Sequence, residues 1–258
     1  MPRIDPRAIV APSARLAEDV EVGPYAIVGE DVELGPGCHI APHAVVLGPT
    51  RMGRDNKVFQ FASIGDAPQD KKYGGEATRL EIGDGNVFRE CCTVNRGTVG
   101  GGGVTRIGNN CLFMAYSHVA HDCSIGDYCI MSNCSALAGH VELGTWVILS
   151  GYAAVHQFCK LGDHAFLANN AAVTRDVPPY VLVAGSPAEP KGINSEGLKR
   201  RGFTSEQIAS VKRAYRVLYR SKLKLSDATA ELSKLAANDE VLKPFVEFLP
   251  RLTRSLIR

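Results

Sequence analysis

The sequence predicts a mainly β fold, a parallel β-helix, followed by an α-helical C-terminal region. A large apolar side chain recurs at every sixth position, and a small or medium side chain follows four residues after each. This period fits neither the 3.6-residue repeat of a helix nor the two-residue alternation of a strand. It is typical of hexapeptide repeats, in which three hexads form a triangular coil of eighteen residues and coils stack about 4.8 Å apart.

The sixth-position residues, or rungs, define the extent of the β-helix. They begin at Val10 and, after two interruptions, run without a break from Ile107 to Val173. Prolines such as Pro24 fall at expected corners, where no N–H group is needed for strand pairing. We expect the β-helix domain to comprise residues 1–190.

Two segments leave the repeat and are expected to form loops. Residues 66–79, DAPQDKKYGGEATR, are polar, and extra loops on repeat scaffolds commonly carry function. Asp70 and Lys72 are therefore candidates for substrate contact. Residues 98–105 contain four consecutive glycines, but no Gly-Lys-Ser/Thr sequence follows. We expect a flexible excursion without a helix there, not a phosphate-binding loop.

The helical region, residues 191–258, follows a boundary rich in proline and glycine, DVPPYVLVAGSPAEPKG. Residues 194–201 predict a short first helix, and Thr204 predicts a capping box before a second. Ser226 is expected to cap a third helix that ends at about residue 237. A fourth is expected from about residue 239 to about residue 249, with a kink or a later start at Pro244.

Composition and charge narrow the class of protein. A hydrophobic content of 45% with 22% charged residues is typical of globular proteins. No apolar run approaches eighteen residues and no signal-like segment opens the chain, so we expect a cytoplasmic protein without a transmembrane segment. The helical region holds 15 basic and 7 acidic side chains, against 14 and 20 before it, and so offers a basic surface to an acidic partner.

The eight cysteines predict neither disulfides nor a metal site. No paired C-x-x-C motifs occur, and none of the thiols is expected to be an exposed nucleophile beside a positive group. Six cysteines fall four residues after a rung and are expected as small interior side chains. These are Cys38, Cys92, Cys111, Cys123, Cys129 and Cys159.

The stacking of coils brings residues eighteen apart into one column. Several polar side chains and one glycine converge in this way on adjacent columns, which predicts a functional site. The stacked sets are His121 with Gly139 and Gln157, Asp122 with His140, and Ala120 with Ala138 and His156. His39, His43 and His164 have no such partners and are expected on the surface or in packing.

The motifs of this chain resemble those of the UDP-N-acetylglucosamine O-acyltransferase family over essentially its whole length. They are the hexapeptide ladder, QDKKYGGEATR, HVAHDCSIGD, LAGHVELG, AVHQFCKLG, DVPPYV and EGLKRRGF. The resemblance implies a left-handed β-helix and transfer of a 3-hydroxyacyl group from acyl carrier protein to the 3-hydroxyl of UDP-N-acetylglucosamine. That reaction opens lipid A biosynthesis. The resemblance also implies a homotrimer with active sites between subunits, and neither cofactor nor metal.

The resemblance assigns a role to each matching residue. His121 is the general base, Asp122 orients it, and the backbone N–H of Gly139 stabilises the oxyanion, without an acyl-enzyme. Asn169 matches a position that partly sets the depth of the acyl groove, where glycine accompanies longer chains, so we expect a shorter chain here. The positions matched to substrate binding are Asp70, Lys72, His118, His140, His156, Gln157, Asn194, Glu196, Arg200 and Arg201.

Three other classes of protein are weighed against this family. The related N-acyltransferase of the same pathway carries an extra N-terminal uridine-binding domain, whereas the rungs here begin at Val10. A zinc hydratase on the same solenoid would use ligands such as His118, His121 and His140, and metal analysis would distinguish it. A non-catalytic, ice-binding solenoid needs flat columns of threonine, which this sequence lacks.

Overall fold

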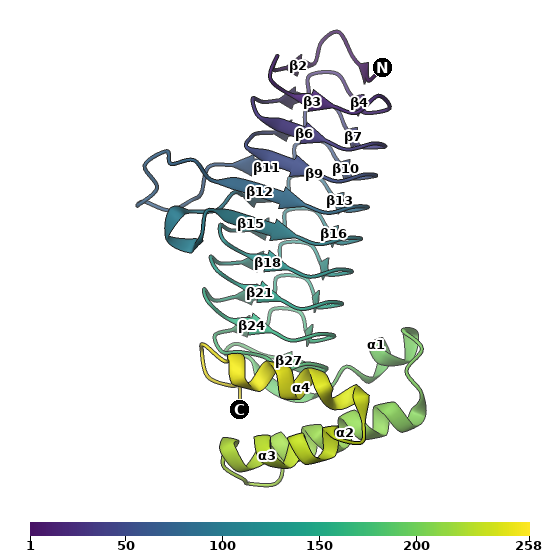
Figure 1. Cartoon of the computed structure of the whole chain (residues 1–258), viewed down its shortest axis with the longest axis vertical. Helices are drawn as coiled ribbons and strands as arrows, with labels where there is room; N and C mark the ends of the chain where they lie inside the picture. Colours follow the sequence, from purple (N-terminus) through teal and green to yellow (C-terminus); the bar gives the residue numbers. More distant parts are fainter.

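The computed structural model describes residues 1–258, all of the chain. Three sheets wrap around one axis as a left-handed parallel β-helix, and helices cover its C-terminal end (Figure 1). The expected fold class is therefore confirmed. None of the helices is long and apolar enough to cross a bilayer.

Each coil contributes one strand to each sheet. Sheet A contains β1 Arg3–Ile4, β4 Glu21–Val22, β7 His39–Ile40, β10 Lys57–Val58, β13 Val87–Phe88, β16 Leu112–Phe113, β19 Ile130–Met131, β22 Ile148–Leu149, β25 Phe166–Leu167, β27 Val181–Ala184 and β28 Glu189–Ile193. Sheet B contains β2 Ile9–Val10, β5 Ile27–Val28, β8 Val45–Val46, β11 Ser63–Asp66, β14 Thr93–Asn95, β17 His118–Val119, β20 Ala136–Leu137, β23 Ala154–Val155 and β26 Ala172–Val173. Sheet C contains β3 Arg15–Leu16, β6 Val32–Leu34, β9 Thr50–Met52, β12 Arg79–Ile82, β15 Val104–Ile107, β18 Ser124–Ile125, β21 Glu142–Leu143 and β24 Lys160–Leu161.

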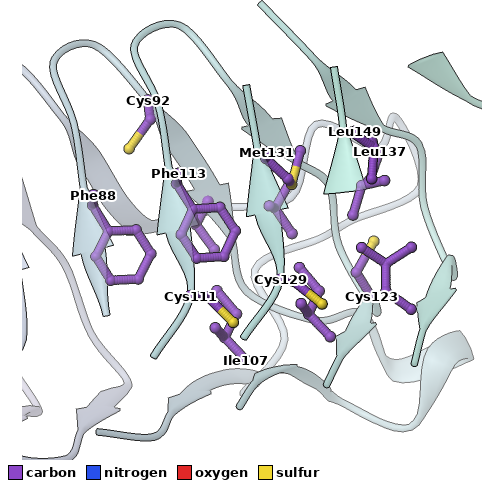
Figure 2. Packing of buried hydrophobic residues seen from close by; sticks show 14 of the residues in the cluster. Phe88, Cys92, Ile107, Cys111, Phe113, Cys123, Cys129, Met131, Leu137 and Leu149 are labelled. Carbon is purple, nitrogen blue, oxygen red and sulfur yellow. The ribbon is translucent and has the colours of Figure 1, made fainter. Parts of the chain in front are cut away.

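The rungs fill the interior of the prism, as the repeat predicts. Phe88 and Phe113 stack on adjacent coils with ring centroids 4.9 Å apart, and Met131 continues the same column (Figure 2). Smaller side chains fit beside them, and the Cys111 thiol donates to the Gly126 carbonyl. All six cysteines expected inside are buried. Burial raises the pKa of the Cys123 thiol to about 12, so this thiol stays protonated and is no nucleophile.

The corners between strands share one backbone pattern. The second corner residue takes a left-handed conformation, as His43 and His140 do. The residue before it accepts a hydrogen bond through its carbonyl, as Pro24 does from the His43 amide at 3.2 Å. Proline, which has no N–H group, fits this position because the ladder needs no donor there.

Both interruptions of the repeat lie on the edge between sheets B and C, to the left in Figure 1. The first connects β11 to β12 and the second connects β14 to β15. The second contains a 3₁₀ turn, η1 Val99–Gly101, so the expectation of a helix-free excursion was wrong. The turn forms because Thr98 caps it, accepting from the Gly101 amide through its hydroxyl at 3.2 Å.

The C-terminal helices begin after β28, which pairs antiparallel with β27 and crosses the expected boundary at residue 190. The helices are α1 Ser195–Arg200, α2 Ser205–Tyr219, α3 Leu225–Ala236 and α4 Lys243–Phe248, with 3₁₀ turns η2 Glu240–Leu242 and η3 Leu249–Arg251. The capping box at Thr204 and the later start at Pro244 are confirmed. The predicted cap at Ser226 was wrong, because the N-cap is Lys224, two residues earlier, and Ser226 lies in the first turn of α3.

Candidate active site

The predicted columns lie at three successive corners on the edge between sheets B and C. His121 and Asp122 connect β17 to β18, and Gly139 and His140 form the same corner one coil further on. The His140 amide donates to the His121 carbonyl at 3.0 Å, and the Phe158 amide donates to the Gly139 carbonyl at 3.1 Å. The eighteen-residue stacking predicted for this region is therefore right.

His121 and Asp122 form a dyad. The Nδ1 atom of His121 lies 2.7 Å from Oδ2 of Asp122, whose side chain is 1% exposed. An ionised carboxylate only accepts hydrogen bonds, so Nδ1 carries the proton in the neutral ring. That tautomer leaves the lone pair of Nε2 available, which is the state a general base requires.

The glycine-rich loop holds the Asp122 carboxylate. The Thr98 amide donates to Oδ1 at 2.7 Å, and the Thr98 hydroxyl donates to Oδ2 at 2.6 Å. The Asp122 amide in turn donates to the Thr105 hydroxyl at 2.8 Å. Gly101 packs against the same carboxylate, where any side chain would collide with it. Sequence reasoning missed Thr98, although four consecutive glycines already signalled a close backbone approach.

Gly139 presents an unused amide beside the imidazole. Its N–H donates no hydrogen bond within the chain, as expected of the corner position that proline occupies elsewhere. A Cβ atom on Gly139 would lie 2.6 Å from Cε1 of His121 and 2.9 Å from Nε2. Glycine thus leaves space next to the imidazole, with a free donor on the adjacent coil.

Two further histidines surround the dyad. His140 lies edge-on to His121 with ring centroids 5.2 Å apart, and its other neighbour is the Phe158 ring at 4.4 Å. Burial lowers the pKa of His140, although the charges of Asp122 and Asp70 act in the opposite direction. Burial, followed by the charge of His121, lowers the pKa of His118. The Nδ1 atom of His118 lies 2.7 Å from the Thr93 hydroxyl.

One group of side chains has the spacing of a metal site. His121, Asp122 and His140 each offer a ligand atom, and these atoms lie within 4.8 Å of one another. His118, which the zinc alternative would use, is not part of this group. Both Asp122 oxygens already accept hydrogen bonds from Thr98, so a cation would compete with that loop for the carboxylate.

The other matched residues divide between two sides of the molecule. Asp70 and Lys72 lie in the β11–β12 loop, on the same edge between sheets B and C as the dyad, and Lys72 is exposed. His156 and Gln157 are exposed one coil beyond Gly139. The residues of α1 lie on the opposite side of the prism (Figure 1). One chain alone therefore does not bring Asn194, Glu196, Arg200 and Arg201 to His121.

The α1 residues line a groove of about 1130 Å³ against sheet A. Its floor is apolar and includes Ile148 and Phe166. Arg201 lies over the Trp146 ring, 4.8 Å from its centroid, and Nη1 lies 3.0 Å from Nδ1 of His164. Burial, aided by the charge of Arg201, lowers the pKa of His164 to about 4.

Several of the predicted side chains also have structural roles. Asn194 caps α1, accepting from the Gly197 amide at 3.1 Å, and Glu196 pairs with Arg200 at 3.2 Å. The packing role expected of His164 is confirmed by its stacking on Tyr180, but it also lines the groove, which no sequence signal predicted. Asn169 is exposed at a corner between sheets A and B, next to Gly151.

Comparison with known proteins gives consistent matches along the chain. Residues 176–257 match the family model described as "Udp N-acetylglucosamine O-acyltransferase; Domain 2". Residues 13–48 and 105–139 match the "Bacterial transferase hexapeptide (six repeats)" model.

Whole-chain relatives agree with these models. The chain is 53% identical to the acyl-[acyl-carrier-protein]–UDP-N-acetylglucosamine O-acyltransferase of Thiobacillus denitrificans, and 50% identical to that of Halorhodospira halophila, over 100% of each chain. It is also similar to the solved UDP-N-acetylglucosamine acyltransferase of Francisella novicida. There the TM-score is 0.97 and the identity 42%, with 99% of this chain and 94% of that chain covered.

Proposed function

The chain belongs to the UDP-N-acetylglucosamine O-acyltransferase family, and from that premise we propose how its site performs the reaction. The protein is an O-acyltransferase that moves an acyl group from acyl carrier protein to UDP-N-acetylglucosamine, the first step of lipid A synthesis. Within that activity, the group moved is a 3-hydroxyacyl chain and the acceptor is the 3-hydroxyl of the sugar. We also propose that the protein acts in the cytoplasm.

The reaction is a direct transfer with His121 as general base. Nε2 of His121 removes the proton of the sugar hydroxyl while its oxygen attacks the thioester carbon. The carbonyl oxygen becomes an oxyanion, to which the free Gly139 amide donates a hydrogen bond. As the tetrahedral intermediate collapses, the C–S bond breaks and the sulfur takes the proton back from His121. No acyl-enzyme forms.

The observation that carries this mechanism is the pairing of a free Nε2 with a free amide on adjacent coils. The Asp122 carboxylate fixes the imidazole tautomer, and the Gly139 N–H has no partner within the chain. A positioned base contributes roughly 10²- to 10⁴-fold in rate, and one oxyanion donor about 3 kcal/mol.

A second copy of the chain completes the site. Arg201 and its neighbours in the α1 groove lie on the opposite side from His121, and the groove has an apolar floor. A cyclic trimer would bring the His121 edge of one copy against this groove of the next. The nucleotide would then lie between subunits, and its diphosphate would meet the arginine forks of α1.

Two experiments test this function. Purified protein, UDP-N-acetylglucosamine and hydroxyacyl carrier proteins should give ester product, and His121→Ala should give almost none. Mixing His121→Ala subunits with Arg201→Ala subunits should then restore part of the activity, because some shared sites receive both intact residues. Absence of restoration in verified mixed oligomers would contradict a site built from two chains.

A metal-dependent hydratase is the second candidate, because His121, Asp122 and His140 are spaced as ligands. The purified protein should be assayed for bound zinc and for carbon dioxide hydration. Stoichiometric zinc with hydratase activity would favour this candidate. Full acyltransfer after exhaustive chelation would favour direct base catalysis.

A further inference from the structure

The C-terminal segment is fixed against the end of the catalytic columns. Asp176 is fully buried, and its Oδ2 atom accepts from the amides of Thr253 at 2.7 Å and Arg254 at 3.0 Å. The Ile257 amide donates to the Asp176 carbonyl at 2.9 Å, and the Ile257 side chain enters the interior of the prism. Residues 253–257 are therefore attached to the β-helix and do not form a free tail.

This attachment places Arg254 in line with the catalytic residues. Its Nε atom donates to the Gln157 carbonyl at 3.2 Å, and its guanidinium carbon lies 5.6 Å from the Phe158 ring centroid. Phe158 stacks in turn on His140, which lies beside His121. The guanidinium thus lies roughly two coils, about 10 Å, from the dyad along the same edge.

The guanidinium of Arg254 has unused donors. It forms no ion pair with a carboxylate, although 17 ion pairs occur in the chain. Its single hydrogen bond is the one that Nε donates to the Gln157 carbonyl. The nearby Asp176 carboxylate is occupied by backbone amides. Arg251, three residues before Arg254 at the end of η3, is instead paired with Glu142 at 2.7 Å.

We propose that Arg254 binds a phosphate group of a substrate at the C-terminal end of the catalytic edge. A free planar fork suits phosphate oxygens, and both substrates of the proposed function carry phosphate groups. The sources are the diphosphate of UDP-N-acetylglucosamine and the phosphopantetheine arm of the carrier protein. This proposal rests on the proposed function only for the identity of these two ligands.

Calorimetric titration of the full-length protein with UDP-N-acetylglucosamine and with free phosphopantetheine tests the proposal without catalysis. Arg254→Gln should weaken the binding affinity for one of these two ligands by about 10- to 100-fold. Arg254→Lys keeps the charge without the planar fork, so its affinity should lie between those of wild type and Arg254→Gln. Thermal unfolding should show that each variant folds. Arg251→Gln is the matched control and should bind like wild type.

The ligand that weakens identifies the source. Loss of UDP-N-acetylglucosamine affinity assigns the site to the diphosphate, and loss of phosphopantetheine affinity assigns it to the carrier arm. In turnover, the KM of the same substrate should rise. Equal affinities for Arg254→Gln and Arg251→Gln toward both ligands would overturn the proposal. Absence of ester product from wild type would instead contradict the proposed function, and the titrations would still decide the phosphate site.

Discussion

A Cβ atom added to Gly139 would lie 2.6 Å from Cε1 of His121, closer than two unbonded carbon atoms approach. The imidazole and the glycine backbone therefore occupy adjacent coils with no room for a side chain between them. This contact explains why the corner residue one coil after His121 is glycine. It also makes the position sensitive to a single methyl group.

Gly139→Ala should lower kcat by about 10²- to 10³-fold, because the methyl group displaces the imidazole and blocks the carbonyl from the amide. The effect should fall mainly on kcat, measured by steady-state assay with both substrates saturating. Gly151→Ala is the folding control. It occupies the same corner position on another edge, where a Cβ meets its nearest atom at 3.6 Å. Unchanged kcat in Gly139→Ala would contradict the assigned oxyanion role.

Asp122→Asn should lower kcat by about 10³-fold or more. The amide can donate to Nδ1 of His121, which stabilises the tautomer with the proton on Nε2, where it cannot act as a base. Asp127→Asn provides a matched control, because Asp127 accepts from the Asn109 amide at 2.7 Å at another corner. Both variants should be compared in kcat and in thermal unfolding. A rate within tenfold of wild type for Asp122→Asn would show that the carboxylate does not set the tautomer.

Thr98→Val should lower kcat by about tenfold, since it removes the hydroxyl donor to Asp122 and keeps the shape of the side chain. Thr98→Ser should restore most of the rate because the hydroxyl returns. The pH profile of kcat/KM should also shift in the valine variant, as the dyad loses one hydrogen bond. Equal rates for the serine and valine variants would show that the hydroxyl has no positioning role.

The stability of the protein should fall as pH falls from about 6.5 to about 4, partly through His164. Its pKa is lowered from 6.5 to about 4, so in this window the unfolded chain binds a proton that the folded chain does not. In His164→Gln, the free energy of unfolding should fall by about 2 kcal/mol less over this pH range, after allowance for solvent access to the ring. Urea unfolding at pH 7.5 and pH 4.5, at one protein concentration, measures this change in unfolding free energy. His39→Gln, which changes an exposed ring, is the control. If the stability of wild type, His164→Gln and His39→Gln depended equally on pH, His164 would not be a source of the pH dependence.

The repeat made much of this structure predictable. A period of six specifies which side chains enter the prism, so the burial of Phe88, Met131 and the six interior cysteines followed directly. The coil length of eighteen then placed Gly139 next to His121 without any structure. Such inferences succeed because each coil repeats the geometry of the previous one.

Contacts outside the repeat were not predictable in this way. Thr98 precedes Asp122 by 24 residues and reaches it through a loop that follows no period. Arg254 reaches Gln157 across 97 residues, because the C-terminal segment returns to the prism after four helices. The predicted cap of α3 was wrong because the helix begins after Lys224, whose side chain makes no capping hydrogen bond and gives no signal in the sequence. Helix boundaries depend on tertiary packing as well as on capping residues.

Asn169 should restrict the length of the acyl chain. It is exposed at the corner between β25 and β26, with its side-chain oxygen near Gly151 of the preceding coil. We expect the acyl chain to extend from the thioester, beside His121 on the edge between sheets B and C, across sheet B to this corner. An amide side chain there fills space that the last methylene groups of a long chain would occupy.

Asn169→Gly should therefore improve turnover of longer donors. Removing the side chain admits additional methylene groups, each worth about 0.8 kcal/mol when buried, so two of them would change kcat/KM by roughly tenfold. The measurement compares ten- and fourteen-carbon hydroxyacyl carrier proteins in competition, for wild type and variant. Asn170→Gly, at the neighbouring exposed corner residue, controls for added backbone freedom. If wild type already used both donors equally, or if Asn169→Gly left their ratio unchanged, Asn169 would not set the chain length.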